Sequence, residues 1–142
     1  MGLDQKVNII DIQEKLEEFY LYKFGDPNNT KLFENAEEPG ELYLHNQYAV
    51  QGFMTELVIS KGAPDGDAEL DGAYIRVREE DLKKLYRISK DLETLKAYAE
   101  KWRKGASKYY GDFEQEQVQG FCRELMKYIA FGDCAVYYES DW

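Results

Sequence analysis

Residues 73–78 alternate strictly between two sets of side chains. One set is apolar and comprises Ala73, Ile75 and Val77; the other comprises Tyr74, Arg76 and Arg78. An alternation with period two predicts a strand with one buried face. Because a helical repeat follows this strand directly, the pattern indicates a fold that mixes strands and helices.

The helical repeat extends from Leu85 to Trp102, with apolar residues at steps of three and four. Such spacing places them on one face of a helix, and a steady repeat of this kind also occurs in coiled coils. The run is short for a coiled coil, so we expect one helix, or two shorter helices, packed on a sheet. A break between two helices would fall at Ser89-Lys90-Asp91.

Other segments carry weaker versions of the same patterns. The further predicted elements are helices over 11–23, 44–60 and 112–132 and a strand over 134–138. Asp112 and Gln115 look like a capping box for the last helix, while residues 7–10 either extend the first helix or form a strand. Residues 25–40 and 61–67 are expected to be loops. The chain is therefore predicted to be one α+β domain over 1–142, with a small sheet packed with three to four helices.

Composition limits what such a domain could bind. The chain has 142 residues, of which 44% are hydrophobic and 15% aromatic, and this is enough apolar surface for a core. A single histidine and two cysteines argue against a closed zinc site, an iron–sulfur cluster or a disulfide framework. No apolar run approaches the roughly 20 residues of a membrane span, and no signal-type segment follows Met1. We therefore expect a cytoplasmic protein without cofactor or metal.

The net charge of -10 arises from 28 acidic and 18 basic residues that are unevenly placed. Residues 1–72 carry -10 and residues 105–142 carry -4, whereas residues 73–104 carry +4. A nucleic-acid backbone would meet like charge on most of this molecule, so we do not expect nucleic acid as a partner. The sequence leaves open whether the basic and acidic segments neutralise each other in the fold.

The basic segment contains a candidate ligand site on the predicted strand and the helix after it. Its residues are Tyr74, Arg76, Arg78, Arg87 and Lys90. Guanidinium groups beside an aromatic ring suit a phosphate or a nucleotide, through paired hydrogen bonds and base stacking. The alternative is that these cations pair with neighbouring carboxylates, as charges on strands and helices commonly do.

Few residues suggest catalysis, since there is no Walker-type phosphate loop, no G-x-S-x-G and no paired-histidine motif. We expect His45 to be a polar surface residue and Cys122, on the apolar face of a predicted helix, to be a core thiol. Residues 67–72 begin like a calcium loop, but Arg78 stands where a bidentate glutamate is needed, so we expect a solvated acidic loop. No catalytic or metal-binding residue is assigned.

Tyrosine is in excess, with 12 residues. Its side chain combines a large contact area with a polar tip, which favours binding surfaces. An acidic, tyrosine-rich surface fits a protein that occupies a basic groove on a partner, as a nucleic-acid mimic does.

Three stretches carry a family resemblance. They are the opening Met1-Gly2-Leu3-Asp4, residues 74–85, and the ending from Tyr109-Tyr110-Gly111 to the tail Tyr137-Tyr138-Glu139-Ser140-Asp141-Trp142. Together they resemble a family of small phage-encoded accessory proteins of uncertain function, sometimes labelled as kinases. Family members often carry a Trp-Arg-Lys…His helix; the comparable segment 47–56 lacks it and has Gln51 at the histidine position. The resemblance implies a phage origin and action in the host cell cytoplasm.

These observations give three hypotheses. The leading one is a non-enzymatic phage accessory protein that inhibits or modulates a host factor, such as a defence component, through the acidic segments 1–72 and 105–142 and their tyrosines. The alternative is a sponge or sensor that binds a small anionic ligand, such as a signalling nucleotide, through Tyr74, Arg76 and Arg78. The third and least favoured is a small carboxylate-dependent hydrolase.

Overall fold

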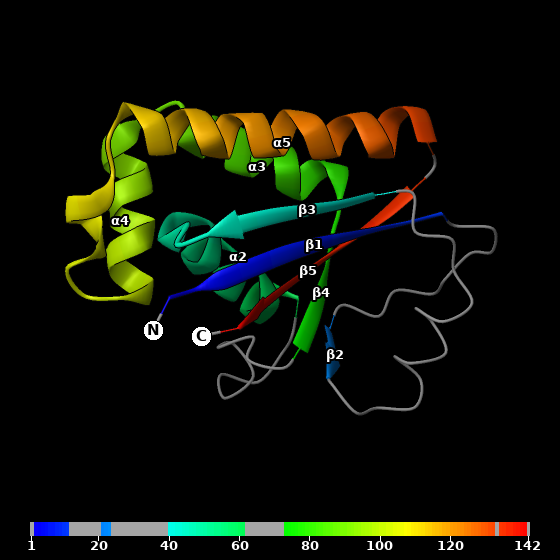
Figure 1. Cartoon of the computed structure of the whole chain (residues 1–142), viewed down its shortest axis with the longest axis horizontal. Helices are drawn as coiled ribbons and strands as arrows, with labels where there is room; N and C mark the ends of the chain where they lie inside the picture. Colours follow the sequence, from blue (N-terminus) through cyan, green and yellow to red (C-terminus); the bar gives the residue numbers. More distant parts are fainter. Residues whose placement is uncertain (1, 12–20, 24–39, 62–72, 133, 142) are drawn as a thin grey trace.

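The fold is a five-stranded antiparallel sheet packed with helices. The computed structural model describes residues 2–11, 21–23, 40–61, 73–132 and 134–141 (Figure 1). Its strands are β1 (Asp4–Asp11), β2 (Leu21–Lys23), β3 (Gly40–His45), β4 (Ala73–Val77) and β5 (Cys134–Asp141). Its helices are α2 (Tyr48–Ser60), α3 (Glu79–Ser89), α4 (Leu92–Trp102), the 3-10 turn η2 (Ala106–Tyr109) and α5 (Asp112–Gly132). This is the α+β class expected from the sequence.

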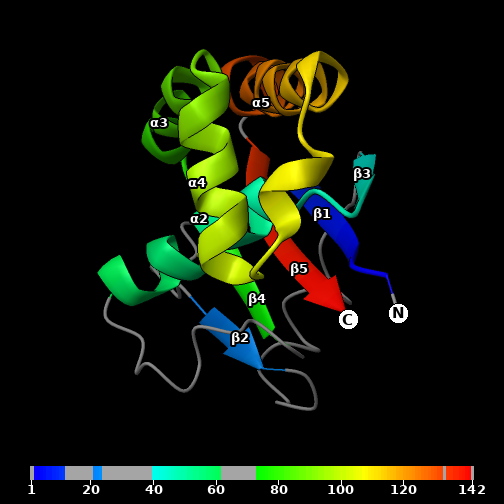
Figure 2. The same ribbon diagram turned by 90° about the vertical axis from the view of Figure 1, so that its left-hand side faces the viewer.

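The strand order is β2-β4-β5-β1-β3, so β5 lies at the centre. Antiparallel register aligns rows of buried side chains across the sheet, with Ile75, Tyr138 and Val7 in one row and Val77, Val136 and Ile9 in the next. Each of these six side chains is at most 1% exposed. Figure 2 shows α2, α3 and α4 on the same side of β1 and β5. The helices contribute apolar residues such as Phe53, Leu85 and Leu95 to the same core.

The strand and helix patterns of the middle of the chain are confirmed. Residues 73–77 of the alternating segment form β4, whereas Arg78 is the N-cap of α3, and the long helical repeat forms two helices that are separated at Lys90 and Asp91. The break is stabilised locally, because the Asp91 carboxylate accepts a hydrogen bond of 3.2 Å from the Glu93 backbone amide at the start of α4. Asp81 does the same for α3, accepting from the Arg78 amide at 2.9 Å.

The predicted helix over 11–23 is wrong at both ends. Asp11 is the last residue of β1 and residues 21–23 form β2, while residues 12–20 lie outside the described part of the chain. The ambiguous residues 7–10 belong to β1, where residues 7–9 pair with both β3 and β5 and Ile10 pairs with β5. Pairing on two sides fixes an extended backbone that local periodicity does not reveal.

The predicted helix over 44–60 begins too early. Leu44 and His45 belong to β3, in which half-buried and exposed residues alternate, and the helix starts at Tyr48. Asn46 adopts a left-handed backbone with φ 55, a conformation that asparagine tolerates and that ends the strand.

The C-terminal elements are close to prediction, with two corrections. The capping contact of α5 joins Glu114 to the Gly111 amide at 3.0 Å, whereas Gln115 donates its side-chain amide to the Ser89 carbonyl at 2.8 Å. The final strand extends to Asp141 and not to Tyr138, and most of its residues are buried because it is the central strand.

The predicted core thiol is confirmed. Cys122 is completely buried on α5, and this burial raises the pKa of its thiol to about 12. The calcium-like stretch 67–72 and most of the expected loop 25–40 lie outside the described residues. In the described part of the chain, no helix is both long and apolar enough to cross a membrane.

Candidate anion-binding site

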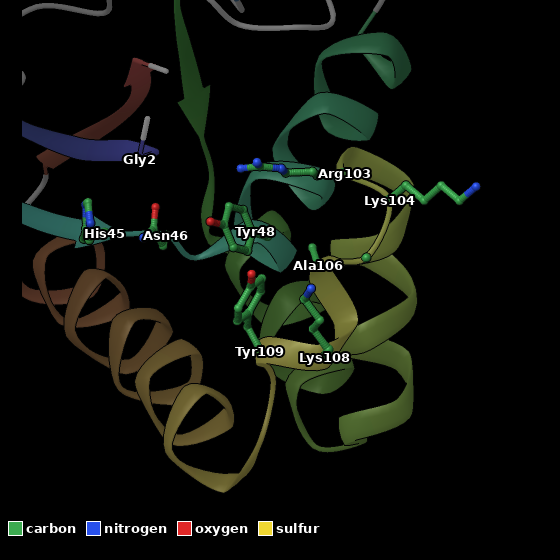
Figure 3. A pocket seen from close by; sticks show the side chains of 10 residues that line it. Gly2, His45, Asn46, Tyr48, Arg103, Lys104, Ala106, Lys108 and Tyr109 are labelled. Carbon is green, nitrogen blue, oxygen red and sulfur yellow. The ribbon is translucent and has the colours of Figure 1, made fainter.

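A pocket of about 480 Å³ lies where the end of α4, the turn η2 and the start of α2 meet (Figure 3). Its lining residues are Gly2, His45, Asn46, Tyr48, Arg103, Lys104, Gly105, Ala106, Lys108 and Tyr109. The volume falls in the range of roughly 300–1,000 Å³ that is usual for small-molecule sites. Most of the larger side chains in this lining are aromatic or basic.

One wall is formed by the corner between β3 and α2. The Asn46 side-chain oxygen accepts a hydrogen bond from the Leu3 amide at 2.8 Å, and the Asn46 amide donates to the Leu3 carbonyl at 2.8 Å. These two bonds hold the N-terminal strand beside the pocket. His45, at the rim, lies 2.9 Å from the carboxylate of Asp4 and is exposed.

A buried polar network fixes the start of α2, and with it Tyr48. The Gln5 side chain accepts from the Gln47 amide at 2.8 Å and donates to the Tyr138 hydroxyl at 2.8 Å. The Tyr110 hydroxyl accepts from the Ala49 amide at 2.7 Å and donates to the Gln47 side-chain oxygen at 2.8 Å. Burial raises the pKa of both tyrosine hydroxyls far above the usual range, so both remain neutral donors. The network ties β1, β5, α2 and η2 into one rigid frame.

The opposite wall is the turn between α4 and η2. Gly105 has φ 88, a left-handed conformation that glycine adopts without steric cost. The Glu100 carboxylate accepts hydrogen bonds from the Gly105 amide at 2.7 Å and the Ser107 amide at 3.0 Å. These two backbone bonds lower the pKa of Glu100. The turn is thereby held in a single shape by a charged group that lies outside the pocket lining.

Aromatic rings meet at the base of the pocket. Tyr48 is only 7% exposed, because its ring stacks on Trp102 with centroids 5.6 Å apart and planes at 18°. Tyr109 contacts Tyr48 at 6.1 Å with planes at 45°, yet it is 58% exposed. The two tyrosines therefore differ: Tyr48 is packed into the fold, whereas Tyr109 presents its ring to the pocket and to solvent.

Basic groups lie against these rings. The Arg103 guanidinium carbon is 5.8 Å from the centre of the Tyr48 ring, and the Lys108 ammonium is 5.2 Å from that of Tyr109. Figure 3 shows Arg103 extended past Tyr48, whereas Lys104 points away from the two rings. Cation–π contacts of this kind orient exposed cations weakly, at about 0.5–1 kcal/mol.

The pocket cations Arg103, Lys104 and Lys108 form no salt bridge with a described carboxylate, a property that they share with Lys84, Arg87, Lys90 and Arg123. Elsewhere in the described structure many lysines form salt bridges: Lys6, Lys61, Lys83, Lys96, Lys101 and Lys127. Among the described residues, no carboxylate lies within 4.0 Å of the charged groups of Arg103, Lys104 or Lys108. A positive site is therefore left available in a chain whose net charge is -10.

Such an arrangement can bind an anion. An arginine fork and a lysine ammonium form charge-assisted hydrogen bonds with phosphate or carboxylate oxygens, and adjacent rings accept a planar group. Among the described residues, no group of three or more His, Cys, Asp or Glu could hold a metal ion.

The sequence-predicted ligand residues do not line this pocket. Tyr74 and Arg76 lie on β4, opposite Glu139 and Tyr137 of β5, and the half-buried Arg78 precedes α3. Arg87 and Lys90 are exposed at the far end of α3, a helix of 11 residues that spans about 16 Å. The five residues are thus spread along a strand and a helix, and their role as a ligand site stays a prediction.

Several individual contacts bear on that stripe of basic residues. Lys83 pairs with Glu79 at 3.2 Å, and the Lys90 ammonium lies 5.1 Å from the centre of the Tyr86 ring. The Arg76 carbonyl accepts from the Lys61 ammonium at 3.3 Å, and the same ammonium lies 2.9 Å from Asp81. The neighbouring Lys83 is therefore paired within the fold, whereas the Lys90 ammonium, like that of Lys108, lies against a ring and forms no salt bridge with a described carboxylate.

Gln51 also has a structural role. It is completely buried and accepts a hydrogen bond of 2.5 Å from the Tyr138 hydroxyl. The residue belongs to the buried network and does not line the pocket.

Sequence reasoning missed the pocket because its two sides are far apart in the chain. A local signal existed in residues 101–110, where four basic and three aromatic residues surround Gly105. Nothing local places Tyr48 beside Trp102, which takes the packing of α2 against α4. The Gly52 backbone makes that packing close, since a Cβ there would fall within 3.0 Å of the Tyr98 carbonyl oxygen.

Comparison with protein-family models, with curated proteins and with solved structures finds no match for this chain.

Proposed function

We propose that the protein is a binding protein for a small anionic ligand, held in the pocket between α4, η2 and α2. The observation that carries the proposal is the placement of Arg103 and Lys108 against two tyrosine rings, with no salt bridge to a described carboxylate. Solvated cations that gain a phosphate partner in such a site form charge-assisted hydrogen bonds without losing an internal one.

The charge of the whole molecule restricts the size of the anion. A long polyanion would extend beyond the pocket and meet the acidic remainder of a chain with net charge -10. A compact ligand meets only the local positive field. This proposal keeps the class of the predicted sponge or sensor and moves its site from the stripe on β4 and α3 to the pocket.

The biological setting belongs to the same proposal. If the chain comes from a phage, as its resemblance implies, the ligand is a small anion of the host cytoplasm, and its capture would remove or report a host signal. No bond is broken in this function, because binding alone is required.

Thermal denaturation in the presence of inorganic phosphate, pyrophosphate and nucleoside monophosphates tests the proposal. A ligand at a hundred times its Kd adds about 2.7 kcal/mol to the stability of the native state, which raises Tm by several degrees. Arg103→Ala should abolish the rise. The matched control is Arg123→Ala, which removes an exposed arginine of α5 that lies outside the pocket; its guanidinium carbon is 6.0 Å from the centre of the Tyr86 ring of α3.

A wild-type Tm that no anion raises would contradict the proposal, and so would a rise that Arg103→Ala and Arg123→Ala reduce equally. The second result would indicate general charge screening and not a site.

A second candidate, the acidic binder of a host protein, is favoured by one observation. Phe113 is 67% exposed in the first turn of α5, beside the exposed carboxylates of Asp112 and Glu116. An exposed aromatic ring among acids suits a basic surface with an apolar hollow. Phe113→Ser should weaken binding to a host protein isolated on the wild-type chain, and added salt should weaken it further. Salt-independent binding that survives the substitution would contradict this candidate.

A further inference from the structure

We infer that the ligand of the pocket is a mononucleotide, with its phosphate on Arg103 and Lys108 and its base on the ring of Tyr109. This inference rests on the proposed function, because it assigns a chemical class to the anion that the pocket would bind.

The first step is the difference between the two tyrosines. Tyr48 is 7% exposed and is already stacked on Trp102, so its ring is part of the wall. Tyr109 is 58% exposed, although it lies 6.1 Å from Tyr48 and lines the same pocket. A large aromatic surface left open in a pocket wall is suited to a second planar group.

The second step is the angle between the rings. Their planes meet at 45°, which makes an inclined corner and not a flat stack. With the ring centroids 6.1 Å apart, no third ring fits between them, so a planar base would stack on the part of the Tyr109 ring that stays exposed. An inorganic anion alone would leave that ring surface uncovered.

The third step is the position of the charges relative to the corner. Arg103 lies over Tyr48 and Lys108 over Tyr109, so both cations stand at the rings themselves. A base that stacks on Tyr109 would take the place of the Lys108 ammonium, which is exposed and can swing toward the phosphate. Arg103 offers a planar fork to the same phosphate. The two cations and the exposed tyrosine ring thus match a ligand in which a phosphate is joined to a flat ring.

The size of the pocket limits the size of the ligand. About 480 Å³ accommodates a ligand of small-molecule size, and the acidic remainder of the chain disfavours a longer strand. A single nucleotide satisfies both conditions, whereas an oligonucleotide does not.

Isothermal titration calorimetry with matched ligands tests the inference. The ligands are the four common nucleoside 5′-monophosphates, ribose 5-phosphate, which lacks the base, and a short single-stranded oligonucleotide. The proteins are the wild type, Tyr109→Ala, Arg103→Ala and the control Tyr43→Ala, which removes another exposed tyrosine beside a lysine, outside the pocket.

In the wild type, at least one mononucleotide should bind more tightly than ribose 5-phosphate by roughly 5- to 150-fold, the range expected for one stacked base. Tyr109→Ala should remove this advantage, so that the mononucleotide and ribose 5-phosphate bind with equal affinity. Arg103→Ala should weaken both ligands, and Tyr43→Ala neither.

The outcomes separate the two claims. If all mononucleotides bind no more tightly than ribose 5-phosphate, the nucleotide inference is overturned while the anion site stands. If neither kind of ligand binds, both claims are overturned. Preference for the oligonucleotide over every mononucleotide would also overturn the inference, in favour of a single-strand binding groove.

Discussion

Gly52 controls how closely α2 approaches α4, and therefore how Tyr48 meets Trp102 and Arg103. A Cβ at Gly52 would fall within 3.0 Å of the Tyr98 carbonyl oxygen, a separation that real Cβ atoms essentially never show. The obstacle is backbone, so no rotamer change relieves it. Gly52→Ala must instead move one helix away from the other.

The expected size of the effect follows from two opposing terms. Replacing glycine by alanine inside a helix gains about 1 kcal/mol from helix propensity. Overpacking a close contact costs about 1–3 kcal/mol, and a rigid carbonyl places this site toward the upper end. We expect Gly52→Ala to lower the free energy of unfolding by about 1–2 kcal/mol. The same displacement should weaken anion binding, because Arg103 follows the end of α4.

Gly120 is the matched control. It lies inside α5, and an added Cβ there would meet nothing within 4 Å. Gly120→Ala should therefore stabilise the protein by about 0.5–1 kcal/mol through helix propensity alone. Urea denaturation followed by circular dichroism measures both variants. If Gly52→Ala were as stabilising as Gly120→Ala, the close approach of α2 to α4 would be refuted.

Three further predictions concern single groups. Tyr110→Phe should destabilise the fold by about 1–3 kcal/mol in urea denaturation, because the buried Ala49 amide and Gln47 oxygen lose their partner; an unchanged midpoint would contradict the network. The pKa of Glu100 is lowered in the fold, so its carboxylate stabilises the fold at pH values above its pKa in the unfolded chain. This stabilisation is lost as the pH falls through its pKa in the folded protein. Glu100→Gln should thus make stability less dependent on pH between about 5 and 3, and a pH profile identical to the wild type would argue against the capped turn. The Cys122 thiol, with its pKa raised to about 12, should resist iodoacetamide at pH 8 in the native protein and react after unfolding, as peptide mass mapping can establish.

Local patterns in the sequence predicted much of the fold. The alternation over 73–78 identifies β4, and the apolar spacing between Leu85 and Trp102 identifies α3 and α4. These elements carry their own periodicity and their own caps, so tertiary contacts are not needed to recognise them. The strand β3 carried a weaker signal of the same kind, since Leu42 and Leu44 alternate with exposed residues.

The candidate site depended on contacts that no local pattern encodes. Tyr48 and Trp102 are brought together by the packing of α2 on α4, and Tyr138 and Gln5 fix the start of α2 from two different strands. Lys108 also lies in residues 105–142, a segment with a negative net charge, although it lines the same pocket as Arg103. Charge summed along the chain therefore indicated a basic stripe, whereas the fold gathers basic groups around a pocket.

The most direct test of anion binding in the pocket is to locate the bound anion on the protein. We would follow the backbone amide resonances of the 15N-labelled chain by NMR during titration with a nucleoside monophosphate. Binding in the pocket should give saturable shifts confined to residues 45–48 and 103–109, and these shifts should be lost in Arg103→Ala. Shifts centred on Arg76 and Arg78, or no saturable shifts at all, would contradict binding in the pocket.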